Sequence, residues 1–78
     1  MDSKTWVFCE SVEKLYPISF AGTEAEMKKA VSNLQERYRR NGHETPFYIW
    51  TGYSWYKGNP PCFELTQTGE MIELEAAA

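Results

Sequence analysis

The segment TEAEMKKAVSNLQERYRRNG, residues 23–42, sets the architecture of this chain because it carries the clearest helix signal. The Thr23 hydroxyl can accept a hydrogen bond from the amide of Glu26 while the Glu26 carboxylate returns to the amide of Thr23, a capping box. Apolar residues then recur at steps of three or four and form one stripe: Met27, Ala30, Val31, Leu34 and Tyr38. The pattern predicts a helix over residues 24–41 that stops at Gly42. One apolar stripe packs on one surface, most economically the face of a sheet.

The other segments alternate in the manner of strands. The expected strands are residues 5–12 and 16–20 before the helix, and 47–50, 53–57, 62–67 and 71–74 after it. Pro17 has no amide hydrogen, which favours an edge position or a bulge for its strand. Thr51-Gly52 and Thr68-Gly69 are typical of tight turns, and each predicts a hairpin.

These elements, in the order β-β-α-β-β-β with room for one further strand, predict a small two-layer α+β domain. It would have an antiparallel sheet of about four to six strands with one helix packed on one face. Residues 1–75 form a single domain in this interpretation, and residues 76–78 form a frayed C-terminal tail.

The aromatic stretch FYIWTGYSWY, residues 47–56, raises the question of a partner surface. If Thr51-Gly52 turns a hairpin, cross-strand pairing places four side chains on one face: Tyr48, Trp50, Tyr53 and Trp55. Phe47 and Ile49 then point the other way, toward the helix. An unbroken strand would instead move the last two aromatics to the opposite side. Because one helix covers one side of a sheet, we expect the Tyr and Trp face to bind a protein partner or a second copy. The alternative is a set of cross-strand pairs beneath a loop.

Charge is unevenly distributed along the chain, whose formal net charge is −3. Residues 21–42 hold five basic and three acidic residues, and residues 43–78 hold one basic and five acidic residues. Glu64, Glu70 and Glu73 follow the aromatic stretch and would form an acidic rim beside it. A dipolar charge distribution of this kind can orient a partner, although solvated surfaces are also commonly charged.

Three kinds of function remain open. The preferred hypothesis is a small non-enzymatic protein-interaction or inhibitor module that uses the four aromatics and the acidic rim. The alternative is single-stranded nucleic-acid binding by the same aromatics with Arg37, Arg39 and Arg40. The acidic total and the expected position of the arginines on the helix side argue against it. The third is an acidic accessory protein of a bacterium or phage, whose carboxylates occupy the nucleic-acid site of another protein.

Catalytic and metal-binding patterns are missing from the sequence. His43 is the single histidine, and no hydrolase motif accompanies it. Cys9 and Cys62 lack the spacing of a zinc module and are expected to be small buried thiols. We therefore expect no enzymatic activity, metal or cofactor. With neither a long apolar run nor a leader pattern, the chain is expected to be cytoplasmic and without a membrane partner.

Overall fold

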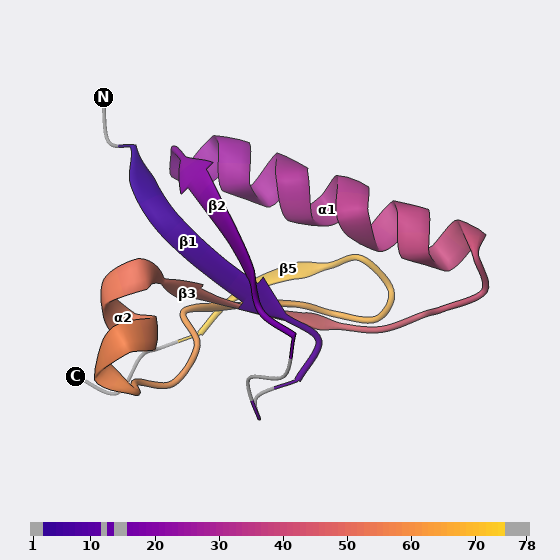
Figure 1. The fold of residues 1–78 in the computed structure, drawn as a ribbon. Coiled ribbons are helices and arrows are strands. Elements are labelled where there is room, and N and C mark those ends of the chain that lie inside the picture. Colours follow the sequence, from indigo (N-terminus) through magenta and orange to yellow (C-terminus); the bar gives the residue numbers. More distant parts are fainter. Residues whose placement is uncertain (1–2, 12, 14–15, 75–78) are drawn as a thin grey trace.

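Helix α1 lies across one face of a five-stranded antiparallel sheet in the computed structural model, which describes residues 3–11, 13 and 16–74 (Figure 1). The sheet order is β2-β1-β3-β4-β5. The elements are β1 (Lys4–Cys9), β2 (Ile18–Gly22), α1 (Glu24–Arg40), β3 (Phe47–Thr51), α2 (Gly52–Lys57), β4 (Phe63–Leu65) and β5 (Met71–Glu73). The predicted α+β class is confirmed, with one additional short helix, α2. The predicted tail over 76–78 lies outside the described residues.

Local sequence signals explain the ends of α1. The capping box is present, with the Glu26 amide donating to the Thr23 hydroxyl at 3.1 Å and the Thr23 amide donating to the Glu26 carboxylate at 2.8 Å. At the other end, Asn41 is the C-cap and Gly42 takes a φ of 82°, a conformation that glycine adopts without strain. The predicted helix is therefore confirmed to within one residue.

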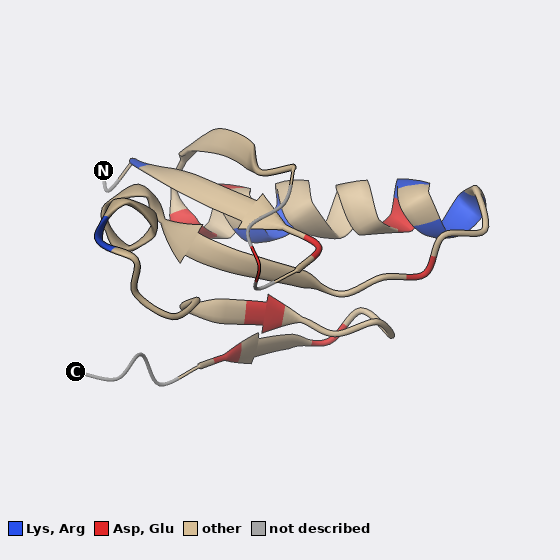
Figure 2. Cartoon of the chain, turned by 60° about the horizontal axis from the view of Figure 1, so that its bottom comes forward, with Lys and Arg blue, Asp and Glu red and all other residues tan. Residues whose placement is uncertain are grey.

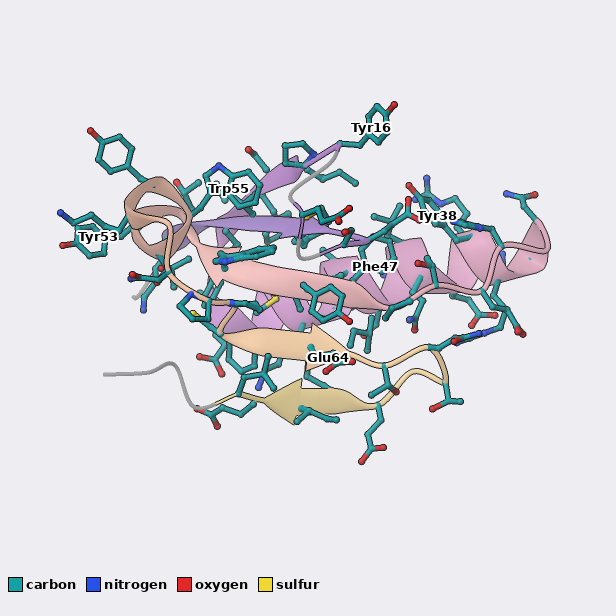
Figure 3. All side chains as sticks on the ribbon, turned by 90° about the horizontal axis from the view of Figure 1, so that it is seen from below. Tyr16, Tyr38, Phe47, Tyr53, Trp55 and Glu64 are labelled. Carbon is teal, nitrogen blue, oxygen red and sulfur yellow. The ribbon has the colours of Figure 1, made fainter. Side chains whose placement is uncertain are left out.

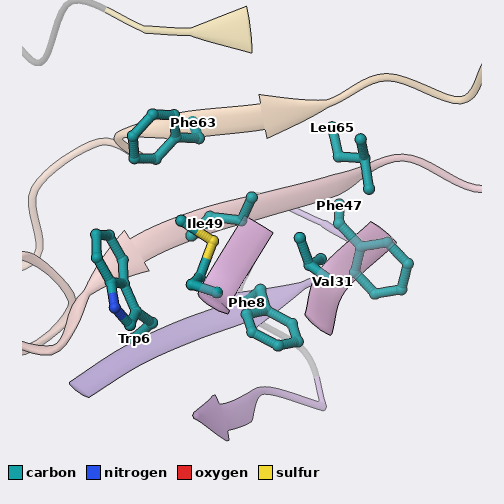
Figure 4. Packing of buried hydrophobic residues seen from close by; sticks show 8 residues of the cluster. Trp6, Phe8, Val31, Phe47, Ile49, Phe63 and Leu65 are labelled. Carbon is teal, nitrogen blue, oxygen red and sulfur yellow. The ribbon is translucent and has the colours of Figure 1, made fainter. Parts of the chain in front are cut away.

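The core lies between α1 and the sheet (Figure 4). Strands β1, β3 and β4 each contribute two alternate residues to it, and α1 contributes two more: Trp6, Phe8, Phe47, Ile49, Phe63, Leu65, Met27 and Val31. The predicted burial of Phe47 and Ile49 beneath the helix is confirmed. The polar side chain of Gln35 also enters this layer, and its buried amide donates to the carbonyls of Thr45 and Thr66, both at 2.8 Å. Those hydrogen bonds compensate the cost of burying the amide.

Strand boundaries differ modestly from the prediction. β1 ends at Cys9, short of the expected residue 12, which lies outside the described residues. β2 begins at Ile18, after Pro17, and ends at Gly22; its predicted edge position is confirmed. The C-terminal hairpin is also confirmed, with β4 and β5 shorter than expected and Gly69 at a φ of 96° in the turn.

The predicted hairpin of residues 47–50 with 53–57 is wrong. β3 pairs with β1 on one side and with β4 on the other, so both of its edges are occupied and no strand from 53–57 can join it. The chain instead turns into α2, whose first amides are capped by the Thr51 hydroxyl, which accepts from Ser54 at 3.0 Å. Gly58 ends this helix in the left-handed region, at a φ of 76°. The observed order is β-β-α-β-α-β-β.

Candidate protein-binding surface

The face of the sheet opposite α1 is partly covered by α2 and the loop after it. Trp50 lies on this face, and its side chain is only 1% exposed. Its indole nitrogen donates to the Asn59 carbonyl at 2.8 Å, and its ring packs edge to face with Trp55 at 5.1 Å. Trp50 is therefore part of a second, smaller packed region rather than a surface anchor, which corrects the expectation from the sequence.

The four predicted aromatic anchors do not form one patch. Tyr53 is 69% exposed on α2 and points away from the sheet, whereas Trp55 on the same helix points back over the strands (Figure 3). Trp55 is half-buried, and so is Tyr48 on the sheet itself. The patch required two paired strands, and the helix geometry of 53–57 separates the side chains that a hairpin would have aligned.

Near β4 and β5, the described residues leave part of the second sheet face open. Tyr48 is paired in register with Glu64, and Glu64 with Ile72, so these three side chains form a row across three strands. They alternate with core residues on each strand and therefore face away from α1. Ile72 is 37% exposed, while Tyr48 and Glu64 are half-buried. We call Tyr48, Glu64 and Ile72 the open-face row.

The three predicted acidic residues are divided by the sheet. Glu64 lies in the open-face row, whereas Glu73 is paired with Phe63 and so falls on the α1 side. Glu70 lies in the turn before β5, where its amide donates to the Thr66 hydroxyl at 3.0 Å. In Figure 2 the positions coloured on β4, β5 and the turn between them are acidic, whereas α1 carries both acidic and basic positions. The open-face row is thus beside carboxylates rather than cations.

The arginines of the alternative hypothesis lie in the helix layer. Arg37, Arg39 and Arg40 occupy the last turn of α1. Arg39 contacts Glu36 at 2.9 Å and the Gln67 carbonyl at 3.3 Å. A shallow hollow beside it is lined by Asn33, Glu36, Arg37 and Arg40. Arg39 therefore helps join α1 to the β4–β5 turn, and the three arginines do not share a face with Tyr48.

His43 forms a surface pair with Glu10. Their side chains, 58% and 38% exposed, approach to 2.7 Å between the imidazole Nε2 and the carboxylate. The imidazole also packs beside Tyr38, with ring centroids 5.6 Å apart. The contact joins the end of β1 to the segment that follows α1. It orients the imidazole on an open surface, where water surrounds both groups.

The cysteines occupy packed positions. Cys9 is buried, and its thiol donates to the Ser11 carbonyl at 3.0 Å. Cys62 is half-buried and packs against the core, with its thiol 3.9 Å from the Ser54 hydroxyl. Within residues 3–11, 13 and 16–74, no three His, Cys, Asp or Glu side chains are grouped closely enough to hold a metal ion.

Neither helix in the described part of the chain has the length and apolar character needed to cross a membrane.

Comparison with protein-family models, with curated proteins and with solved structures gave no significant match to the chain.

Two features of this surface differ from what the sequence suggested. Ile72 was not among the expected partner-binding residues, although alternation in β5 could have indicated that it faces opposite to Met71. Trp50 was expected there, but its burial depends on α2, which the strand-like pattern of 53–57 concealed.

Proposed function

We propose that this protein is a non-enzymatic binding module that uses the open-face row to bind a protein with a basic surface. The observation that carries the proposal is the row itself. It places the ring of Tyr48, the carboxylate of Glu64 and the exposed side chain of Ile72 side by side on three paired strands.

The chemistry of the row suits a protein partner. Tyrosine provides a large, rigid contact area with a polar end, and it is enriched among residues that dominate binding energies. Ile72 adds apolar area at a position where exposure has no evident structural advantage. Glu64 sits between them, so a lysine or arginine of the partner could pair with its carboxylate while the flanking side chains exclude water.

Charge distribution favours a basic protein over nucleic acid at this site. Glu64 is in the row and Glu70 lies in the adjoining turn, so phosphates approaching this part of the sheet would be repelled. The arginines that would follow a phosphate backbone are in the α1 layer, and Arg39 already contacts Glu36 and the Gln67 carbonyl. Part of the same proposal is that the protein acts in the cytoplasm as an accessory or inhibitor protein of a bacterium or phage.

The surface position of His43 also supports a binding role over catalysis. Its carboxylate partner, Glu10, could orient it, but a general base works best beside a bound substrate and away from bulk water. At 58% exposure, the His43 side chain has little enclosure of that kind.

The test starts from a bacterial cell extract. Its proteins with basic surfaces are first enriched by binding to a heparin resin. Immobilised wild-type protein should retain a component that, once purified, binds it reversibly and is displaced by duplex DNA. Tyr48→Ala should weaken that binding at least about tenfold, which corresponds to about 1.4 kcal/mol. Glu64→Gln should weaken it less and reduce its salt dependence.

Glu24→Gln, which removes an exposed carboxylate from α1, is the matched control and should leave the binding unchanged. Equal binding by wild type and Tyr48→Ala would contradict the proposal. So would saturable binding of single-stranded DNA or RNA that is lost in an Arg39→Ala, Arg40→Ala double variant. That second outcome would favour the nucleic-acid alternative.

A further inference from the structure

The two edges of the sheet are unlike each other. β5, at one edge, contains Glu73 and follows Glu70, and charged residues of this kind discourage strand pairing. β2, at the other edge, reads Ile18-Ser19-Phe20-Ala21-Gly22 and contains neither a charge nor a proline. Within the described residues β1 is the only strand that pairs with it. An uncharged five-residue edge is a template for another strand.

We infer that β2 pairs with β2 of a second copy of this chain, antiparallel and centred on Phe20. This arrangement is argued from the edge itself and does not depend on the proposed function. It places Ser19 of one copy beside Ala21 of the partner subunit, and Ile18 beside Gly22 of the partner subunit. The two sheets then continue into one, with both copies of α1 on the same face.

The side chains of β2 suit this symmetric pairing on both faces. Ser19 and Ala21 are exposed on the face away from α1, and both are small, so neither obstructs the approach of an identical strand. On the α1 face, Ile18 and Phe20 are only half-buried although both pack against the core. A second copy would cover their remaining apolar surface, which gives the association a hydrophobic contribution.

Gly22 completes the fit on the α1 face. A Cβ at this position would approach the Phe20 ring to 2.8 Å and a Glu26 carboxylate oxygen to 2.9 Å, so both side chains already lie over the glycine. Ile18 of the partner subunit, brought opposite Gly22, would meet the Phe20 ring and the carboxylate end of Glu26, and no side chain of Gly22 itself. The order of side chains along β2 is self-complementary, because a large residue of one copy meets Gly22 of the other. β2 itself carries no charge that would select a foreign strand, and both features favour a second copy as the occupant.

Sedimentation of the full chain tests the inference directly. Protein concentrations between about 1 μM and about 1 mM detect dimers with dissociation constants in that range. Wild-type protein should pass from the mass of one chain to twice that mass. A Ser19→Lys, Ala21→Lys double variant brings like charges directly opposite each other and should remain at the mass of one chain. The matching double glutamate variant should also be monomeric, and a mixture of the two should regain the doubled mass.

The control adds two lysines at exposed positions near the other edge, Thr68→Lys and Ile72→Lys, and should dimerise as the wild type does. Amide hydrogen exchange of the wild-type protein provides a readout that needs no variant. Exchange in β2 should slow as concentration rises, while exchange in β5 stays constant. A wild type that keeps the mass of one chain throughout, or a dimer unaffected by the β2 lysines, would overturn the inference.

Discussion

Helices α1 and α2 begin in the same way but depend on different contacts. In each, the hydroxyl of a threonine accepts a hydrogen bond from the amide three residues later, at 3.1 Å for Thr23 and 3.0 Å for Thr51. α1 then continues for 17 residues and buries Met27 and Val31, whereas α2 has 6 residues and none is buried.

The difference in length and burial between the two helices shows that an N-cap fixes where a helix begins but does not by itself stabilise it. An isolated helix shorter than about 12 residues is marginal in water, so a cap alone does not stabilise α2. α2 is held instead by the packing of Trp55 on Trp50 and by the hydrogen bond from Trp50 to Asn59. α1 contributes Met27 and Val31 to the main core and covers the core side of the sheet. We therefore expect damage to α1 to lower global stability, and damage to α2 to open one end of the molecule first.

The largest loss of global stability should come from replacing a buried residue of α1. Met27→Ala removes a side chain that is 0% exposed in the main core, and it should lower the free energy of unfolding by about 3 kcal/mol. Urea unfolding followed by tryptophan emission and by far-ultraviolet circular dichroism should show one coincident transition. A loss below about 1 kcal/mol would mean that α1 is not essential to the core.

Removing the contact between α2 and the sheet should lower the free energy of unfolding by a smaller amount. Trp55 is half-buried, so Trp55→Ala should cost about 2 kcal/mol, roughly half of what is usual for a fully buried tryptophan. Because Trp50 loses a covering ring, its emission should shift to the red in native buffer. Amide exchange should accelerate in 52–57 and remain unchanged in α1. Equal acceleration in both helices would show that α2 is not a separate unit.

The two caps provide a matched pair. Thr23→Ala and Thr51→Ala each remove a hydroxyl that accepts one backbone hydrogen bond, and each should cost about 1 kcal/mol. For Thr23→Ala the cost should appear in global urea unfolding. For Thr51→Ala most of it should appear as faster exchange in α2. If Thr23→Ala affected only local exchange and Thr51→Ala lowered global stability, the comparison of the two helices would be contradicted.

The smallest loss of stability should come from breaking an exposed ion pair on α1. Lys28 and Glu24 form an exposed pair at 3.0 Å, one helical turn apart. Glu24→Gln should lower the free energy of unfolding by about 0.3 to 0.5 kcal/mol at low salt, and the difference from wild type should disappear in 1 M salt, where the screening length is about 3 Å. Thermal unfolding of both proteins at the two salt concentrations measures the difference in stability. A difference that persists at high salt would mean that the ion pair is not its cause.

Much of the fold could be predicted because its signals are local. The capping box of Thr23 and Glu26, the apolar stripe and Gly42 bound α1 without any knowledge of the sheet. Gly69 marked the C-terminal hairpin, and alternation assigned Phe47 and Ile49 to the core. These patterns operate over a few residues and do not depend on what the segment packs against.

Residues 53–57 could not be assigned by the same means. Their alternating aromatic character is typical of a strand, and Thr51-Gly52 resembles a hairpin turn. The same threonine serves equally well as a helix N-cap. The choice depended on β1 and β4 occupying both edges of β3, and those pairings connect residues far apart in the chain.

The sequence by itself determined the class of fold, the position and ends of α1, and which side chains of β3 face that helix. Backbone hydrogen bonds, caps and side-chain period carry that information within each segment. Only the tertiary structure decided that Trp50 is buried, that Tyr53 and Trp55 separate on α2, and that Tyr48, Glu64 and Ile72 form one row. Each of these depends on strand order and register, because a side chain is exposed or covered according to what lies across the sheet from it.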